Sequence, residues 1–308
     1  MDLVRPPLPT AGVHLLAGVE LGGTKCVCIL GTGPSDIRAQ VRIPTGGRDE
    51  TLTRIAAVLD SWQADYGPLR AIGIASFGPL DLRRASKTYG HITGTAKPGW
   101  QGTDVVGRLG HGRAVPVGFN TDVNGAALAE GRWGAAQGLD DFAYITVGTG
   151  VGVGLVVAGR CVFGCNHTEL GHVRIARLAG DTWPGVCRAH GDCVEGLASG
   201  PAIATRAGMP AEEISPQSEV WQSVSHALAQ LIHTILLATA PRRVLVGGGV
   251  AQGRPELLES VRRKLVTSLN GYLNLDELTG GISRYVVPPG LGALAGPLGS
   301  LALAADAA

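Results

Sequence analysis

Two copies of one local pattern constrain the fold of this 308-residue chain more than any other feature. In each copy, an apolar stretch of strand length breaks at a cluster of glycines and then resumes. Such a pattern predicts two strands joined by a tight turn. Because the copies lie roughly 130 residues apart, they predict two related domains that face one cleft. The first copy comprises 14–20, Gly22–Gly23 and 25–30, and the second comprises 142–147, 148–154 and 155–158.

The stretches between and after these hairpins alternate between helical and strand patterns. Apolar residues with helical spacing occupy 51–66, 123–131, 221–240 and 255–269, and short apolar runs occupy 71–76, 115–120 and 243–246. Strands that alternate with helices predict an α/β fold. We expect an N-terminal domain over 1–120 and a C-terminal domain over 121–290, with a final helix over 291–305 that packs back on the first domain.

The composition argues against nucleic-acid and membrane partners. Charged residues make up 17% of the chain, the net charge is +1 and aromatic residues make up 5%, whereas a nucleic-acid surface needs basic patches or stacking platforms. No apolar run of membrane-spanning length is free of glycine and charge, and the N-terminus lacks the layout of a signal peptide. Six cysteines in a chain without an export signal belong in a reducing compartment. We therefore expect a soluble, cytoplasmic protein.

Three glycine-rich turns follow apolar strands, at Glu20–Lys25, Val147–Gly154 and Gly247–Val250. Glycine lets backbone N–H groups approach a phosphate, and the hydroxyls of Thr24 and Thr149 can add donors. A single such turn could equally be a hairpin without a ligand, but three of them favour nucleotide binding. Neither G-x4-G-K-[ST] nor a strand–G-x-G-x-x-G–helix unit is present. The candidate nucleotide-binding residues of these turns are Gly22, Gly23, Thr24, Lys25, Gly148, Thr149, Gly150, Gly248 and Gly249.

The segment 164–195 concentrates metal-binding side chains. Cys187, His190 and Cys193 form C-x2-H-x2-C, and His172 lies upstream as a fourth ligand. This set predicts a tetrahedral, closed, structural zinc site. The alternatives are a Cys187–Cys193 disulfide or two unlinked thiols, but a disulfide would leave both histidines unexplained. Glu169 and Glu195 bracket the cluster in the sequence and are not needed to complete it.

Seven segments of the chain together carry a family resemblance. They are Glu20–Lys25, Ser76–Asp81, Thr95–Trp100, Asp122–Glu130, Thr146–Gly154, Glu169–His172 and Pro184–Gly196. Together they resemble the ROK sugar kinases (repressor, open reading frame, kinase), in particular their bacterial fructokinase branch, over about residues 14–305. The resemblance places the chain in the superfamily of actin, hexokinase and the heat-shock ATPases. By this resemblance the first and fifth segments are phosphate loops, the second and third are fructokinase-branch segments, and the remaining three are, in chain order, the catalytic motif, the sugar motif and the zinc segment.

The resemblance implies a two-domain actin/hexokinase-like (ribonuclease H-like) fold with an interdomain cleft. It implies ATP-dependent phosphorylation of a hexose, with D-fructose converted to fructose 6-phosphate, and it implies Mg²⁺, a structural Zn²⁺ and a homodimer. Asp122 would be the general base, although its position alone also suits a helix N-cap. Glu20 and Thr24 would face Mg²⁺ and the γ-phosphate. The sugar contacts that the resemblance implies are Gly78, Pro79, Asn124, Glu169, His172 and Glu195.

Two alternatives stay open. One is a kinase of the same family for glucose, mannose or an N-acetylhexosamine. The other, from a different class, is a sugar-sensing regulator without a DNA-binding domain, since repressors of this family carry an N-terminal helix-turn-helix and the first hairpin here starts near residue 14. The chain also departs from many relatives, with Glu20 in place of Asp and Thr121 in place of Asn.

Overall fold

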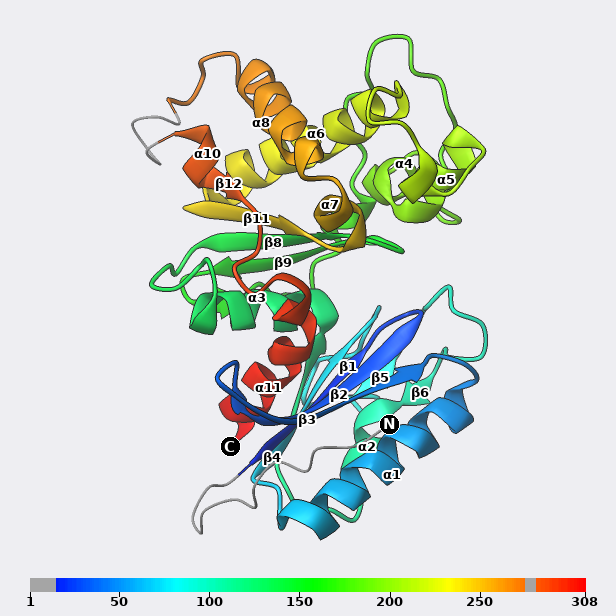
Figure 1. The fold of residues 1–308 in the computed structure, drawn as a ribbon, viewed down its shortest axis with the longest axis vertical. Helices are drawn as coiled ribbons and strands as arrows, with labels where there is room; N and C mark the ends of the chain where they lie inside the picture. Colours follow the sequence, from blue (N-terminus) through cyan, green and yellow to red (C-terminus); the bar gives the residue numbers. More distant parts are fainter. Residues whose placement is uncertain (1–14, 275–280) are drawn as a thin grey trace. The chain divides into compact units, whose positions relative to one another are not determined.

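The computed structural model describes residues 15–274 and 281–308, which form two compact units. Unit 1 comprises the described residues up to Ala129, together with Cys165–His167 and Leu294–Ala308. Unit 2 comprises Glu130–Gly164 and the described part of Thr168–Ala293 (Figure 1). Residue 14 of the first predicted strand and residues 275–280 of the expected C-terminal domain lie outside the described residues.

The elements of unit 1 are β1 (Leu16–Leu21), β2 (Lys25–Gly33), β3 (Asp36–Pro44), α1 (Arg48–Tyr66), β4 (Ala71–Ser76), β5 (His91–Ile92), β6 (Thr103–Asp104), α2 (Val105–Gly110), β7 (Val117–Thr121) and α11 (Ala295–Ala307). Helix α3 (Asp122–Trp133) begins in unit 1 and ends in unit 2. The elements of unit 2 are β8 (Phe142–Val147), β9 (Val151–Val157), β10 (Arg160–Cys161), η1 (Leu170–His172), α4 (Val194–Ala198), α5 (Gly200–Ala207), η2 (Ala211–Glu213), α6 (Val220–Thr239), β11 (Arg243–Gly247), α7 (Gly249–Gly253), α8 (Pro255–Leu269), α10 (Ile282–Tyr285) and β12 (Val286–Val287).

The two units contain sheets of the same topology. The strand order is β3-β2-β1-β4-β7 in unit 1 and β10-β9-β8-β11-β12 in unit 2. In each sheet the first three strands along the chain pair antiparallel, and the two later strands are added in parallel. The repeated hairpin of the sequence is therefore the start of a repeated five-stranded sheet.

A row of three glycines lets α11 pack closely on the sheet of unit 1. Gly18, Gly73 and Gly118 are register partners on the adjacent strands β1, β4 and β7. A Cβ atom at each would lie 1.9–2.2 Å from an atom of Ser300 or Leu303 of α11. Glycine is required in this row because backbone of the helix touches backbone of the sheet. Helix α1 covers the opposite face (Figure 1).

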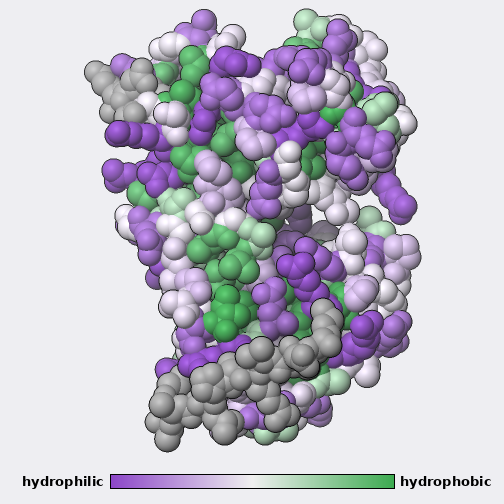
Figure 2. Space-filling model, in the orientation of Figure 1, coloured by the Kyte–Doolittle hydropathy of each residue, from purple (hydrophilic) through white to green (hydrophobic). Residues whose placement is uncertain are grey.

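In unit 2 the long apolar helix α6 packs with α8 over one face of the sheet (Figure 1). Its core-facing side chains, including Leu228, Leu231 and Ile232, are fully buried. On the face of the molecule shown in Figure 2, hydrophilic side chains alternate with small groups of hydrophobic ones. Among the residues that the structure describes, no helix combines the length and the apolar character needed to cross a membrane.

One predicted turn is shorter than expected. The glycine-rich stretch 148–154 was predicted to be all turn, but β9 already begins at Val151. Gly152 and Gly154 remain in the strand because they pair with Thr146 and Tyr144 of β8. Ladder hydrogen bonds to a central strand outweigh the low strand propensity of glycine at these two positions.

Candidate active site

The first glycine turn, Gly22–Thr24, joins β1 to β2 in unit 1. The amide of Gly22 donates to the carbonyl of Lys25 at 3.1 Å. A Cβ atom at Gly22 would lie 2.6 Å from that carbonyl oxygen, so this position tolerates only glycine. Gly23 and Thr24 are exposed at the tip. The turn is therefore tight, and the backbone at its tip is accessible to a ligand.

Glu20 lies at the end of β1, on the face of the sheet that α11 covers. A Cβ atom at Gly296 would lie 2.0 Å from Oε1 of Glu20, so the carboxylate packs directly on the start of α11. Burial, together with the negative charge of Asp122, raises the pKa of Glu20 to about 7, although Lys25 and Arg42 oppose the shift. The charge of Asp122 thus adds to the effect of burial on Glu20.

Asp122 is the first residue of α3 and directly follows β7. Thr121 caps the helix, because its hydroxyl accepts a hydrogen bond from the amide of Asn124 at 3.2 Å. Oδ1 of Asp122 accepts from the amide of Val123 at 2.9 Å. Burial raises the pKa of Asp122 to about 6. The carboxyl group is therefore mostly ionised at pH 7 and can still accept a proton.

Asn124 lies two residues after Asp122 in α3, and the residue is 3% exposed. Its side-chain amide donates to Oδ1 of Asn120 at 2.8 Å. The same oxygen of Asn120 accepts from the amide of Thr121 at 2.9 Å. Asn124 thus helps to fix the junction between β7 and α3.

The turn at Gly78–Pro79 contains a cis peptide bond. The carbonyl of Pro79 accepts from the amide and the hydroxyl of Thr93, at 2.7 and 3.0 Å. Nε2 of His167 accepts from the amide of Leu80 at 2.9 Å, which assigns the unprotonated nitrogen of this ring. His167 is 6% exposed and belongs to unit 1. This buried histidine is a site residue that the sequence patterns did not identify.

In unit 2, the four predicted metal ligands lie together. One ligand atom from each of His172, Cys187, His190 and Cys193 lies within 4.8 Å of the others. Nδ1 of His172 is 3.6 Å from both sulfur atoms, and Nδ1 of His190 is 3.7 Å from that of Cys187. Two backbone hydrogen bonds between Cys187 and Gly191 close the loop that carries His190. Both cysteines are free thiols, not a disulfide.

Glu195 connects this cluster to the second glycine turn. Its Oε1 lies 3.9 Å from Nε2 of His172, and its Oε2 accepts from the amide of Val151 at 3.1 Å. A Cβ atom at Gly150 would lie 2.5 Å from that Oε2, so the turn and the carboxylate are in contact. Gly171 likewise packs on the carbonyl of Val151. Gly171 belongs to η1, so its contact with Val151 fixes the position of this short helix. The exposed Glu169 immediately precedes η1.

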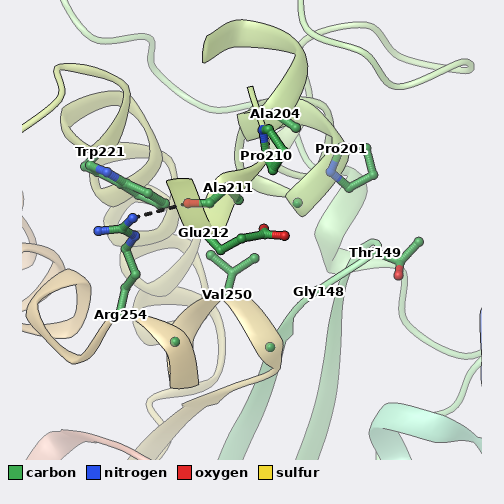
Figure 3. Close-up of a pocket in the computed structure, with 13 residues that line it drawn as sticks. Gly148, Thr149, Pro201, Ala204, Pro210, Ala211, Glu212, Trp221, Val250 and Arg254 are labelled. Atoms are coloured by element: carbon green, nitrogen blue, oxygen red, sulfur yellow. Dashed lines mark hydrogen bonds between the residues drawn. The ribbon is translucent and has the colours of Figure 1, made fainter. Parts of the chain in front are cut away.

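A pocket of about 790 Å³ opens in unit 2 beside the second glycine turn (Figure 3). This volume suits a nucleotide-sized ligand. Trp221 and Arg254 stack at one end, with the guanidinium carbon 4.4 Å from the ring centroid. The carboxylate of Glu212 points into the pocket, and Gly148 and Thr149 lie on the other side (Figure 3). The lining residues are Gly148, Thr149, Gly200, Pro201, Ala204, Pro210, Ala211, Glu212, Trp221, Gly249, Val250, Gly253 and Arg254.

The pocket combines predicted and unpredicted residues. Gly148, Thr149 and Gly249 were expected from the glycine turns, whereas Gly248 does not line it. The contribution of α5 was missed. A usable signal was present, because Ser199 caps this helix and a proline follows in its first turn.

Comparison with known proteins identifies the family. The ROK family model matches residues 16–307. A fructokinase of Zymomonas mobilis subsp. mobilis is 39% identical over 290 residues, with 93% of this chain and 95% of that protein covered. A fructokinase of Pediococcus pentosaceus is 38% identical over 290 residues, with 94% and 97% covered.

Solved structures agree with this assignment. The crystal structure of a ROK hexokinase from Thermus thermophilus superposes with a TM-score of 0.76 at 29% identity, covering 95% of this chain and 98% of that one. This similarity confirms the predicted α/β fold of the actin/hexokinase type. The family match and the two relatives cover nearly the whole chain, so it belongs to the ROK family.

Proposed function

We propose that this protein is an ATP-dependent fructokinase, which transfers the γ-phosphoryl group of ATP to D-fructose and forms fructose 6-phosphate. The observation that carries the proposal is the place of Asp122, a carboxylate at the junction where the edge strand β7 meets the start of α3, and burial raises its pKa to about 6. A general base works best when its pKa lies near the working pH. The two fructokinases that are 38% and 39% identical support fructose as the acceptor.

Asp122 would accept the proton of the attacking sugar hydroxyl as the oxygen–phosphorus bond forms and the bond to ADP breaks. Thr121 caps α3, so the cap does not depend on Asp122. Asn124 and Asn120 hold the junction on which Asp122 stands. The chain therefore supplies a base whose position is fixed by its neighbours.

The pocket of unit 2 is the proposed nucleotide site. Trp221, with the Arg254 guanidinium stacked on its ring, lines the end proposed for the base, and the turn at Gly148–Thr149 offers backbone donors to the phosphates. Gly22, Gly23, Thr24 and Lys25 in the first turn, with Gly150, Gly248 and Gly249 in unit 2, are the remaining proposed phosphate-side residues. Catalysis of phosphoryl transfer depends on such positioning and on electrostatic stabilisation.

Mg²⁺ fits the carboxylate of Glu20. Burial and the charge of Asp122 raise the pKa of Glu20 to about 7, and a divalent cation would relieve this crowding of negative charge. Carboxylate oxygens are suitable Mg²⁺ ligands, and the ion neutralises charge on the phosphates when it is bound. We assign Glu20, with Thr24 beside it, to this role.

Zinc fits the cluster of His172, Cys187, His190 and Cys193. Sulfur and nitrogen ligands of one tetrahedral zinc lie about 3.5 Å apart, given bonds of about 2.3 and 2.0 Å, and the closest pairs here lie at 3.6 Å. With four protein ligands the ion would be structural. His172 would bind it through Nδ1, which leaves Nε2 facing the carboxylate of Glu195 at 3.9 Å.

The proposed sugar contacts are Gly78, Pro79, Asn124, Glu169, His172 and Glu195. The zinc would hold His172, and through it Glu195, in place. A panel of hexoses with Mg-ATP, followed by release of ADP, tests the substrate. Fructose should give the highest kcat/KM among fructose, glucose, mannose and N-acetylglucosamine, and a clear preference for glucose would overturn the choice of acceptor. The family resemblance also leads us to propose a homodimer, which light scattering after size-exclusion chromatography measures.

A further inference from the structure

We propose that Thr45 and Lys97 are positioning residues for phosphoryl transfer, because they fix the peptide planes of the first glycine turn and so aim its N–H groups at the phosphates. The inference rests on the proposed kinase function of this turn. Neither residue belongs to a glycine turn or to the catalytic motif. Both lie in unit 1, Thr45 directly after β3 and Lys97 in the long loop before β6.

Every carbonyl of the turn Gly22–Thr24 is held by one of these two residues. The hydroxyl of Thr45 donates to the carbonyl of Gly22 at 2.8 Å. The ammonium of Lys97 donates to the carbonyl of Gly23 at 2.6 Å. The amide of Thr45 donates to the carbonyl of Thr24 at 2.9 Å.

These bonds determine where the N–H groups point. In a trans peptide the C=O and the N–H of the same plane point in opposite directions, and the peptides of this turn are trans. A plane whose carbonyl is held by Thr45 directs the N–H of Gly23 away from Thr45. A plane whose carbonyl is held by Lys97 directs the N–H of Thr24 away from Lys97.

The N–H groups that are aimed in this way remain available. Within the described part of the chain, neither the amide of Gly23 nor that of Thr24 donates to an acceptor. Both residues are exposed. Successive unpaired backbone N–H groups form an anion-binding concavity. The turn therefore has its carbonyl acceptors occupied, while the N–H donors of Gly23 and Thr24 are available, which is the arrangement that a phosphate requires.

The two positioning residues are themselves anchored. Nε1 of Trp100 donates to the carbonyl of Gly46 at 3.2 Å, and Trp100 is fully buried. This contact joins the loop that carries Lys97 to the segment that carries Thr45. Lys97 also lies 3.5 Å from the carbonyl of Thr45. The donors thus form one assembly behind the turn.

Paired substitutions separate the positioning role from a direct charge on the phosphate. Lys97→Met removes the donor and the charge, and Lys97→Arg keeps both. Thr45→Val removes the hydroxyl donor from a residue that has no charge, and Thr45→Ser restores it. Lys87→Met is the matched control, since Lys87 is an exposed lysine of the same unit.

We expect kcat/KM for ATP to fall roughly tenfold to a hundredfold in Lys97→Met and roughly three- to tenfold in Thr45→Val, as for loss of a charged and a neutral hydrogen bond. Lys97→Arg and Thr45→Ser should recover most of this loss, and KM for fructose should stay within about twofold. Calorimetry adds a readout besides turnover. Affinity for a non-hydrolysable ATP analogue should fall in Lys97→Met and Thr45→Val, whereas affinity for adenosine should not.

The outcomes are distinguishable. If wild-type protein binds no ATP analogue, the proposed function fails. If wild type binds it and both deletion variants bind and react as wild type does, the inference alone is wrong. If Lys97→Met is impaired while Thr45→Val is not, Lys97 acts through its charge on the phosphate and the positioning role is overturned. A thermal unfolding midpoint near that of Lys87→Met shows that each variant is folded.

Discussion

The hydroxyl of Thr121 accepts a hydrogen bond from the amide of Asn124, 3.2 Å away, across the first turn of α3. Helix capping therefore belongs to Thr121, next to the residue proposed as the general base. The position of Asp122 in the sequence suited either a cap or a base, the family resemblance implied the base, and the contact of Thr121 supplies the cap from the neighbouring residue.

Asp122→Asn should lower kcat by at least about a hundredfold, because the lost contribution is general base catalysis, while affinity for fructose stays near that of wild type. Turnover of purified protein and calorimetry with fructose measure the two quantities. Thr121→Val is the matched control: it should lower the free energy of unfolding by about 1 kcal/mol, as loss of an N-cap does, with much smaller loss of turnover. An Asp122→Asn enzyme with nearly full turnover would show that another group takes the proton.

The rate should depend on pH through Asp122, whose pKa burial raises to about 6. The base must be ionised, so kcat/KM for fructose should fall as pH decreases through about 6 and level off on the alkaline side. A pH profile from 5 to 8.5 at saturating Mg-ATP provides the measurement. A flat profile over this range would exclude a base with that pKa.

Asp122 should also reduce stability at neutral pH. Its folded-state pKa of about 6 exceeds the ordinary value of 3.8, so the protonated form is favoured by folding. The stability that comes from the protonated carboxyl group is fully present below about pH 4, and it is lost as pH rises through 6. Asp122→Asn should therefore be more stable than wild type at pH 7.5 and unfold at a higher temperature. The gain in unfolding free energy should be at most about 3 kcal/mol, since one pKa unit corresponds to about 1.4 kcal/mol. The gain should shrink at pH 4.5, and an equal gain at both pH values would point to a cause other than titration.

Metal analysis should find about one zinc per chain, since one set of four ligands is present in the cluster. Chelation should lower the unfolding temperature and loosen the segment around Cys187–Cys193, because binding energy of a structural ion is folding energy. Cys187→Ser should lose the ion, whereas Cys165→Ser should keep it, since Cys165 is exposed and lies outside the cluster. A metal-free preparation with full activity and an unchanged unfolding temperature would refute the zinc site.

Ala204 of α5 lines the pocket of unit 2, which offers a test of where the nucleotide binds. Ala204→Leu would occupy part of the pocket, so KM for ATP should rise roughly tenfold or more while KM for fructose changes little. Ala204→Ser, which adds little volume, is the control. Equal KM values for ATP in all three proteins would place the nucleotide elsewhere.

The hairpins, the family and the metal cluster could be predicted because their signals are local. Glycine next to apolar runs marks a turn wherever it occurs, and C-x2-H-x2-C is contiguous apart from His172. No pattern in the sequence assigned a role to His167, Thr45 or Lys97, although Lys97 lies in the segment Thr95–Trp100, because each acts on backbone groups tens of residues away. Such contacts depend on the register of the folded chain, which no short pattern encodes.

The same reason explains why the glycine row of unit 1 was missed. Gly18, Gly73 and Gly118 lie on three strands and become neighbours only when the sheet forms. Individually, each could be read as an ordinary small residue in a strand.

This row has a consequence for the chemistry. Glu20 follows Gly18 by two residues on β1 and touches Gly296, one helical turn before the Ser300 that lies over Gly18. The distance between α11 and the sheet therefore also determines how closely the start of α11 approaches the carboxylate of Glu20. Because Gly18, Gly73 and Gly118 have only hydrogen where other residues have a side chain, α11 can lie this close to the three strands. A methyl group added at any one of these glycines would clash with α11, push the helix away from the sheet and thereby alter the surroundings of Glu20.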